Sequence, residues 1–124
     1  MPPKISSAEW EVMNQVWGRH PVTSAEVLEA LPPENAWKQK TVNTFLTRLV
    51  QKGVLSVSKQ ANVNVYSAKL KREECIASES ETFLQRVFQG AAGPLLLHFC
   101  DRVDLSEEEI RELQKRLRQK KGRP

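Results

Sequence analysis

One segment, KTVNTFLTRLVQK at residues 40–52, constrains the fold more than any other part of the chain. Its apolar residues recur at spacings of three and four, which predicts the buried face of an amphipathic helix. These residues are Val42, Phe45, Leu46, Leu49 and Val50. The other face holds hydroxyls, amides and two long bases, and it lacks an acid. Such side chains suit contact with phosphates and base edges in a DNA major groove. A solvated face on an ordinary helix would explain the same pattern, so the neighbouring segments must decide.

The charge around this segment is uneven. No Asp or Glu lies between Glu34 and Glu73, although eight Lys and Arg residues do, and the whole chain has a net charge of only +4. A local positive field of this kind is typical of a surface that binds a polyanion. Chance clustering in a mildly basic protein is the alternative.

Two shorter helices are expected before this segment. Ser6 with Glu9 and Thr23 with Glu26 both have the spacing of a capping box, so helices should begin near residues 7 and 24. Glycine and proline residues at positions 18, 21, 32 and 33 should end them. The third helix is expected from about residue 39 to residue 52, with Gly53 as its C-terminal cap. This order matches the helix-turn-helix plan.

The periodicity changes immediately after Gly53. Val57, Val63 and Val65 alternate with small or polar residues, which predicts a two-stranded hairpin with a polar tip at residues 58–62. A hairpin directly after the third helix is the wing of a winged helix. A hairpin that merely stabilises the fold is the alternative. The predicted DNA-binding residues are Lys38, Lys40, Thr41, Asn43, Thr44, Thr47, Arg48, Lys59, Gln60 and Asn62.

Three more helices are expected beyond residue 70, at about residues 73–89, 95–102 and 107–121. They would bury little by packing only on one another, and a second copy of the chain is the simplest partner. The predicted dimerisation residues are Phe83, Leu84, Val87, Leu95, Leu96, Phe99, Ile110, Leu113 and Leu117. The fold class expected is therefore mainly α with a small β-hairpin. A winged helix-turn-helix DNA-binding domain at residues 1–70 would precede a three-helix dimerisation domain at residues 71–124.

Several classes of protein are excluded by the sequence. The apolar runs are too short for a membrane span and the N-terminus lacks a signal peptide, so a cytoplasmic protein without membrane insertion is expected. Cys75 and Cys100 are expected to be reduced, partly buried thiols. Two cysteines and two histidines so far apart do not predict a metal site. No arrangement of acids or nucleophiles predicts catalysis, and no cofactor is expected.

The order of these pieces resembles the BlaI/MecI/CopY family of bacterial penicillinase repressors over almost the full length. The matching stretches are ISSAEWEVMNQVW, KTVNTFLTRLVQKG, VLSVSKQANVNVYSA, TFLQRVFQG and SEEEIRELQKRL. The resemblance implies a homodimeric winged-helix repressor that binds inverted-repeat operators. It also places Lys40, Thr41, Asn43 and Thr44 at positions that contact bases and phosphates. Relatives often carry a long basic residue where this chain has Asn43, which implies a different operator preference.

The resemblance further implies a switch. Penicillinase repressors are inactivated when a membrane sensor metalloprotease system triggers cleavage of an Asn-Phe bond in the dimerisation domain. The corresponding pair here is His98-Phe99, in which only the aromatic residue is kept. The cysteine-rich ending of the copper-responsive branch is missing, which argues against copper sensing. Two alternatives stay open at this point: a winged-helix regulator released by direct ligand binding, and a winged-helix module that binds only proteins.

Overall fold

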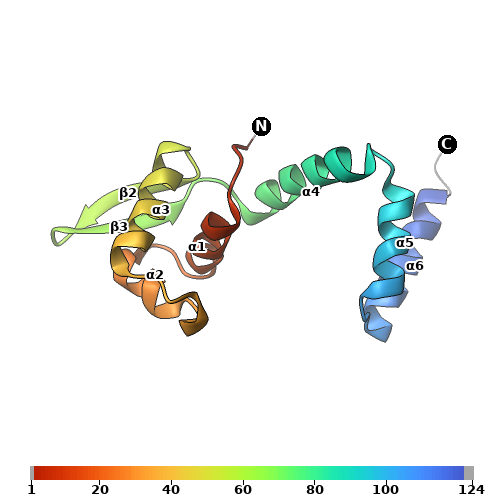
Figure 1. Ribbon diagram of the computed structural model, residues 1–124, viewed down its shortest axis with the longest axis horizontal. Helices are drawn as coiled ribbons and strands as arrows, with labels where there is room; N and C mark the ends of the chain where they lie inside the picture. Colours follow the sequence, from red (N-terminus) through yellow and green to blue (C-terminus); the bar gives the residue numbers. More distant parts are fainter. Residues whose placement is uncertain (1, 122–124) are drawn as a thin grey trace. The chain divides into compact units, whose positions relative to one another are not determined.

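The computed structural model describes residues 2–121, and the chain divides into two compact units, Met1–Ser80 and Glu81–Pro124. The first unit contains α1 (Ser7–Gly18), β1 (Val22–Thr23), α2 (Ser24–Ala30), the 3-10 turn η1 (Pro33–Asn35), α3 (Gln39–Gln51), β2 (Leu55–Gln60) and β3 (Val63–Ala68). Helix α4 (Arg72–Phe88) crosses the boundary, and α5 (Ala92–Arg102) and α6 (Glu107–Lys121) follow (Figure 1).

Local sequence signals fix the ends of the first three helices. Ser6 caps α1 and Thr23 caps α2, each in a complete capping box with the glutamate three residues later. Helix α3 ends in a Schellman motif. The amide of Val54 donates to the carbonyl of Leu49 at 3.0 Å, and Gly53 adopts a positive φ of 81°. The helix boundaries expected at all three places are confirmed.

The sheet differs from the expected two-stranded hairpin. Strand β1 adds a third strand, in the order β1-β3-β2, and pairs Val22 with Tyr66 and Thr23 with Val65. Two residues between helices are too few to give a periodic signal, which is why the sequence pattern missed β1. The polar tip expected at residues 58–62 is also shorter. Strands continue to Gln60 and Val63, and only Ala61 and Asn62 form the turn, both with positive φ.

A single core lies in the first unit. Every buried hydrophobic residue in the described part of the chain falls between Ile5 and Cys75, and α1, α2, α3 and the sheet supply most of them. The largest of these side chains include Met13, Leu46, Leu49 and Leu55. Helices α1 and α2 and the sheet therefore hold α3 in place through one face and leave its other face exposed.

The two cysteines depart from expectation. Cys75 is buried, and burial raises the pKa of its thiol, but Cys100 is exposed rather than partly buried. Because Cys75 packs into the first core, the first turns of α4 belong to that unit. The compact units consequently divide inside α4.

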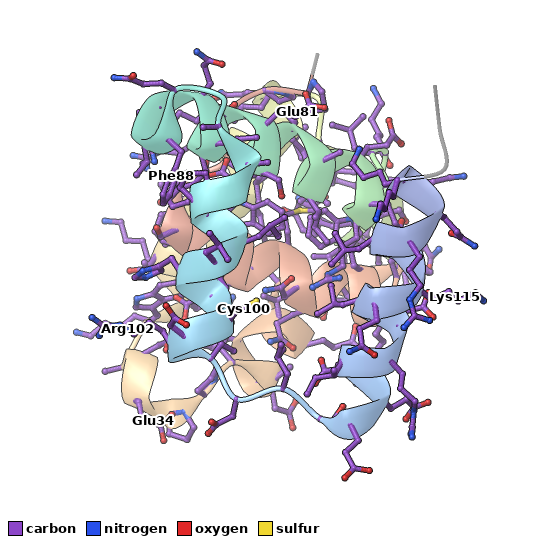
Figure 2. All side chains as sticks on the ribbon, turned by 90° about the vertical axis from the view of Figure 1, so that its right-hand side faces the viewer. Glu34, Glu81, Phe88, Cys100, Arg102 and Lys115 are labelled. Atoms are coloured by element: carbon purple, nitrogen blue, oxygen red, sulfur yellow. The ribbon has the colours of Figure 1, made fainter. Side chains whose placement is uncertain are left out.

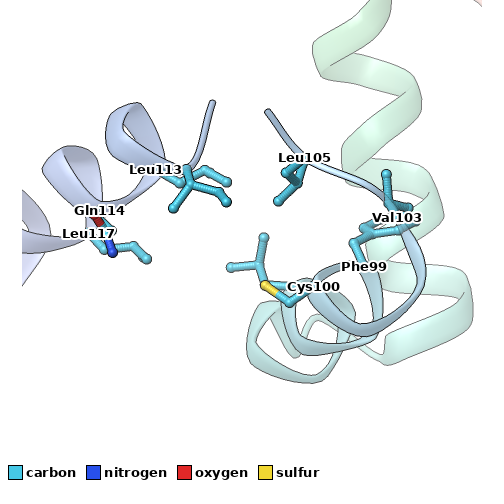
Figure 3. A pocket seen from close by; sticks show the side chains of 9 residues that line it. Phe99, Cys100, Val103, Leu105, Leu113, Gln114 and Leu117 are labelled. Carbon is cyan, nitrogen blue, oxygen red and sulfur yellow. The ribbon is translucent and has the colours of Figure 1, made fainter. Parts of the chain in front are cut away.

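Helices α5 and α6 of the second unit carry an apolar groove. Their side chains are drawn in Figure 2, where Cys100 lies on α5 and Lys115 on α6 points away from α5. The groove has a volume of about 570 Å³ and is lined by Leu96, Phe99, Cys100, Val103, Leu105, Ile110, Leu113, Gln114 and Leu117 (Figure 3). Within the described residues of this unit no side chain is buried, so the groove is open to solvent.

Candidate nucleic-acid interface

The exposed face of α3 collects most of the predicted DNA-binding residues. Lys40, Asn43, Thr44, Thr47 and Arg48 are exposed, and Thr41 is half-buried. The opposite face buries Val42, Leu46 and Leu49 completely. Helical periodicity thus separates a core face from a polar face that contains no acid.

The N-terminus of α3 is not capped by the side chain of its N-cap residue. Lys38 occupies the cap position with an extended backbone, and in the described chain its side chain makes no capping hydrogen bond. The first turn contains no acid. A helix N-terminus carries a partial positive charge, and here no acid in the first turn compensates it. This charge therefore adds to those of Lys38 and Lys40.

Arg48 is supported by aromatic side chains. Its guanidinium carbon lies 5.9 Å from the centre of the Phe45 ring, and Phe45 lies 5.1 Å from Trp37. This stacking limits the freedom of the Arg48 side chain while its charge stays exposed. The two half-buried aromatic residues thereby support a charged group at the surface.

The hydroxyls of two threonines on this face are oriented by the helix itself. Thr44 Oγ1 donates to the carbonyl of Lys40 at 3.0 Å, and Thr47 Oγ1 donates to the carbonyl of Asn43 at 2.9 Å. Because the protons are used within the helix, each oxygen offers its lone pairs to an outside donor. The threonines therefore present acceptors.

The hairpin places a second set of predicted residues away from α3. Strand β2 contacts α3, whereas the tip of the hairpin projects away from the helix (Figure 1). Lys59 and Gln60 end β2 and Asn62 lies in the turn, and all three are exposed. The structure therefore distributes the predicted residues over two surfaces, one on the helix and one at the hairpin tip.

One basic residue in the acid-free stretch, Lys52, is paired within the protein. Lys52 Nζ lies 2.6 Å from Glu9 Oε1 and donates to the carbonyl of Lys4 at 3.0 Å. Glu9 is buried, so this ion pair joins α1 to the residue that follows α3. The charge of Lys52 therefore serves the fold rather than the exposed positive surface.

Two further residues were missed by the sequence analysis. Ser24, at the start of α2, and Gln39, at the start of α3, hydrogen-bond to each other and to Asn43. The spacing of four between Gln39 and Asn43 could have indicated the helical pair. The contact with Ser24 could not be found this way, because it depends on how the two helices pack.

The predicted dimerisation residues lie on the three C-terminal helices. Leu96, Phe99, Ile110, Leu113 and Leu117 line the groove between α5 and α6. Phe83, Leu84 and Val87 lie on α4 and Leu95 on α5, outside the groove lining. His98 and Phe99 are exposed neighbours within α5, with ring centres 5.9 Å apart.

Among residues 2–121, no group of three His, Cys, Asp or Glu side chains is placed to hold a metal ion. No helix in this range is long and apolar enough to cross a membrane.

Known proteins resemble both the sequence and the first unit. The penicillinase repressor family profile matches residues 5–119. The penicillinase repressor of Bacillus licheniformis is 36% identical over 121 residues, covering 98% of this chain and 94% of the relative. The methicillin resistance regulatory protein MecI of Staphylococcus aureus is 33% identical over 117 residues, covering 94% of this chain and 95% of the relative.

Two solved structures agree with the fold. The solution structure of the DNA-binding domain of the repressor BlaI superposes with a TM-score of 0.53 at 35% identity, covering 60% of this chain and 90% of that one. The B. licheniformis BlaI monomer in complex with the blaP half-operator gives a TM-score of 0.52, also at 35% identity, with the same coverage. The winged helix-turn-helix prediction is confirmed.

The family consists of transcriptional repressors and not of enzymes. With a family match over nearly the whole length and relatives above 30% identity, this chain belongs to the penicillinase repressor family.

Proposed function

We propose that this chain is a transcriptional repressor that binds inverted-repeat operator DNA as a homodimer. The observation that carries the proposal is the acid-free, exposed polar face of α3, which the core holds from the other side. In this function α3 enters the major groove and Lys59 at the hairpin tip contacts the DNA backbone. The BlaI complex with a half-operator supports this role, because it pairs the same fold with DNA.

Dimerisation is proposed to occur through the second unit. Phe99 is 46% exposed, Ile110 42%, Leu113 40% and Leu117 55% in the single chain. Exposed apolar side chains that line a continuous groove mark a surface for association. A second copy would cover this surface and hold two copies of α3 at one spacing, as an inverted repeat requires.

The switch that relieves repression is proposed to be cleavage at His98-Phe99 after a signal from a membrane sensor. Both residues are exposed, but the bond lies inside α5. A protease binds extended backbone, so α5 would have to open locally before the cut. The alternative switch is a small ligand that binds directly and lowers the affinity for DNA.

Footprinting on the DNA upstream of the protein's own gene tests the repressor function. The expected result is protection of two half-sites with a two-fold symmetric sequence. Protection of a single half-site by the intact chain would contradict the dimer. Absence of any sequence-specific protection, with a chain shown to be folded, would contradict operator binding.

A test with the sensor present distinguishes the two switches. Under the cleavage proposal, a chain with Phe99→Leu, which removes the aromatic residue at the bond but keeps an apolar side chain in the groove, stays intact and keeps its DNA occupied after the inducing signal. Loss of occupancy without any fragment in the unmodified chain would instead favour direct ligand binding.

A further inference from the structure

A small hydrogen-bond cluster connects α2 to the exposed face of α3. Gln39 Nε2 donates to Ser24 Oγ and, at 3.2 Å, to Asn43 Oδ1. Ser24 Oγ in turn donates to the same Asn43 oxygen. Ser24 and Gln39 are half-buried and Asn43 is exposed, so the cluster lies at the edge of the proposed DNA surface.

The cluster leaves the Asn43 amide able to donate hydrogen bonds but not to accept further ones. Its oxygen already accepts two hydrogen bonds, which are the two that an amide oxygen can accept through its lone pairs. None of the hydrogen bonds found in the described part of the chain uses Asn43 Nδ2. Asn43 is thus left with donors to offer to a partner outside the chain.

An asparagine whose amide oxygen and amide nitrogen are both free pairs with adenine, because the oxygen accepts from N6 while the nitrogen donates to N7. An asparagine that only donates cannot accept from adenine N6. It suits guanine, whose N7 and O6 are both acceptors on the major-groove edge.

We infer that Ser24 and Gln39 are positioning residues that make Asn43 a donor, so that the operator has guanine rather than adenine opposite Asn43. This inference rests on the proposed function, since it concerns how the same face of α3 selects its DNA. The bases Lys40 and Arg48 flank the amide in sequence but carry no acceptor to replace its oxygen. The selectivity at this one base pair therefore depends on a residue of α2 that need not touch DNA.

The experiment selects bound duplexes from a randomised library with the full-length chain, and then measures competition between duplexes that differ at one base pair. Asn43→Ala locates the position that Asn43 contacts, as the one whose preference is lost. At that position the unmodified chain is expected to prefer guanine over adenine by roughly tenfold, the low end of discrimination by a good base contact.

The double variant Ser24→Ala/Gln39→Ala frees the Asn43 oxygen. Its expected result is a fall of the guanine-to-adenine ratio at that position to about one or below, while other positions keep their preferences. The single variant Ser24→Thr leaves Gln39 unchanged and keeps a hydroxyl at position 24. It should therefore keep the preference for guanine. Gln51→Ala is the matched control, because it truncates an exposed glutamine at the other end of α3.

Thermal unfolding followed by tryptophan fluorescence checks that each variant is folded. An adenine preference in the unmodified chain would overturn the inference, as would an unchanged ratio in the folded double variant. It is also overturned if Asn43→Ala alters no position in an otherwise specific operator. Failure to select any specific sequence is a different result, because it removes the proposed function itself.

Discussion

Glu9 is the only buried charged side chain in the described part of the chain, and it joins α1 to the residue that follows α3. Its carboxylate accepts from the Ser6 amide at 2.8 Å and from Lys52 Nζ at 2.6 Å. Burial raises the pKa of Glu9, but the hydrogen bonds from Lys52 and Ser6 together outweigh burial, and the pKa lies below its usual value of 4.5. A carboxylate with a lowered pKa stabilises the folded state above its unfolded pKa.

Glu9→Gln is expected to lower the free energy of unfolding by about 1–3 kcal/mol at pH 7, since the capping pattern accepts glutamine but the ion pair is lost. The unmodified chain loses this contribution as the pH falls below 4.5 through the folded pKa of Glu9. The difference between the two proteins should therefore shrink in acid. Urea denaturation at pH 7 and at low pH measures it.

Glu26→Gln is the matched control for this prediction. Glu26 has the same capping position in α2, but its ion-pair partner Arg19 is on the surface at 3.4 Å. A smaller loss of stability is expected for this variant. Equal losses for both variants would show that the pair with Lys52 adds nothing beyond the cap.

The sequence predicts the cap formed by Glu9 but not the ion pair. The capping box needs only Ser6 and Glu9, which are three residues apart, whereas Lys52 is 43 residues from Glu9. The same limit applies to Ser24, which lies 19 residues from Asn43. Contacts within one helical turn follow from local spacing, and contacts between helices require the packed core.

At the level of single elements, the end of α3 is set by Gly53. The positive φ of 81° suits glycine, and a β-carbon built there meets no atom within 4 Å. The cost of adding a side chain is therefore confined to the backbone. Periodicity and the glycine sufficed to predict this boundary, whereas β1 is too short for any periodic signal.

Gly53→Ala is expected to lower the free energy of unfolding by about 1–2 kcal/mol, the cost of a left-handed backbone for a residue with a β-carbon. Gly18→Ala is the control, because Gly18 is helical and also has open space around it. This control should be stabilised by about 0.5–1 kcal/mol. Urea denaturation of both variants checks the pair, and a loss at Gly18 or no loss at Gly53 would contradict the backbone argument.

The hairpin is the second element with a measurable role. Lys59→Ala should lower the slope of log Kd against log salt by about one unit, because the proposed phosphate contact is lost. Binding to specific and random DNA should weaken alike. Gel-shift titrations at several salt concentrations provide the slopes.

Lys69→Ala removes the same charge just after β3, away from the tip, and should change the slope less. A slope unaffected by Lys59→Ala would mean that the wing does not touch the DNA backbone.

For the whole molecule, the uneven distribution of buried residues is the main fact. The core lies between Ile5 and Cys75, and the apolar side chains of α5 and α6 remain exposed. The three helices beyond residue 70 could be predicted from periodicity and capping. What covers their apolar surface is a prediction, because a second copy does not leave a pattern in one sequence.

Leu113→Glu is expected to prevent dimerisation, because it puts a charge into the apolar groove. Sedimentation should report a monomer, and affinity for a two-half-site operator should fall by roughly 10²–10⁴-fold as the linked second binding event is lost. All three tryptophans precede residue 38, so tryptophan fluorescence reports independently that the first unit is folded.

Lys115→Glu is the control, since this side chain also lies on α6 but points away from α5 (Figure 2). It should remain dimeric. A monomeric control, or a dimeric Leu113→Glu variant, would contradict the assignment of the groove to the dimer interface.

The confinement of the core to residues before the proposed cut has a consequence for how fast repression can return. If the chain is cut as proposed, a fragment ending at His98 would keep every hydrophobic residue that is buried in the described part of the chain, so the product would be a folded half-site binder and not an unfolded chain. Such a product would compete for half-sites only at high concentration and could not be rejoined. Repression would then return only through synthesis of new chains. The delay after the signal ends would equal the time that intact chains take to accumulate.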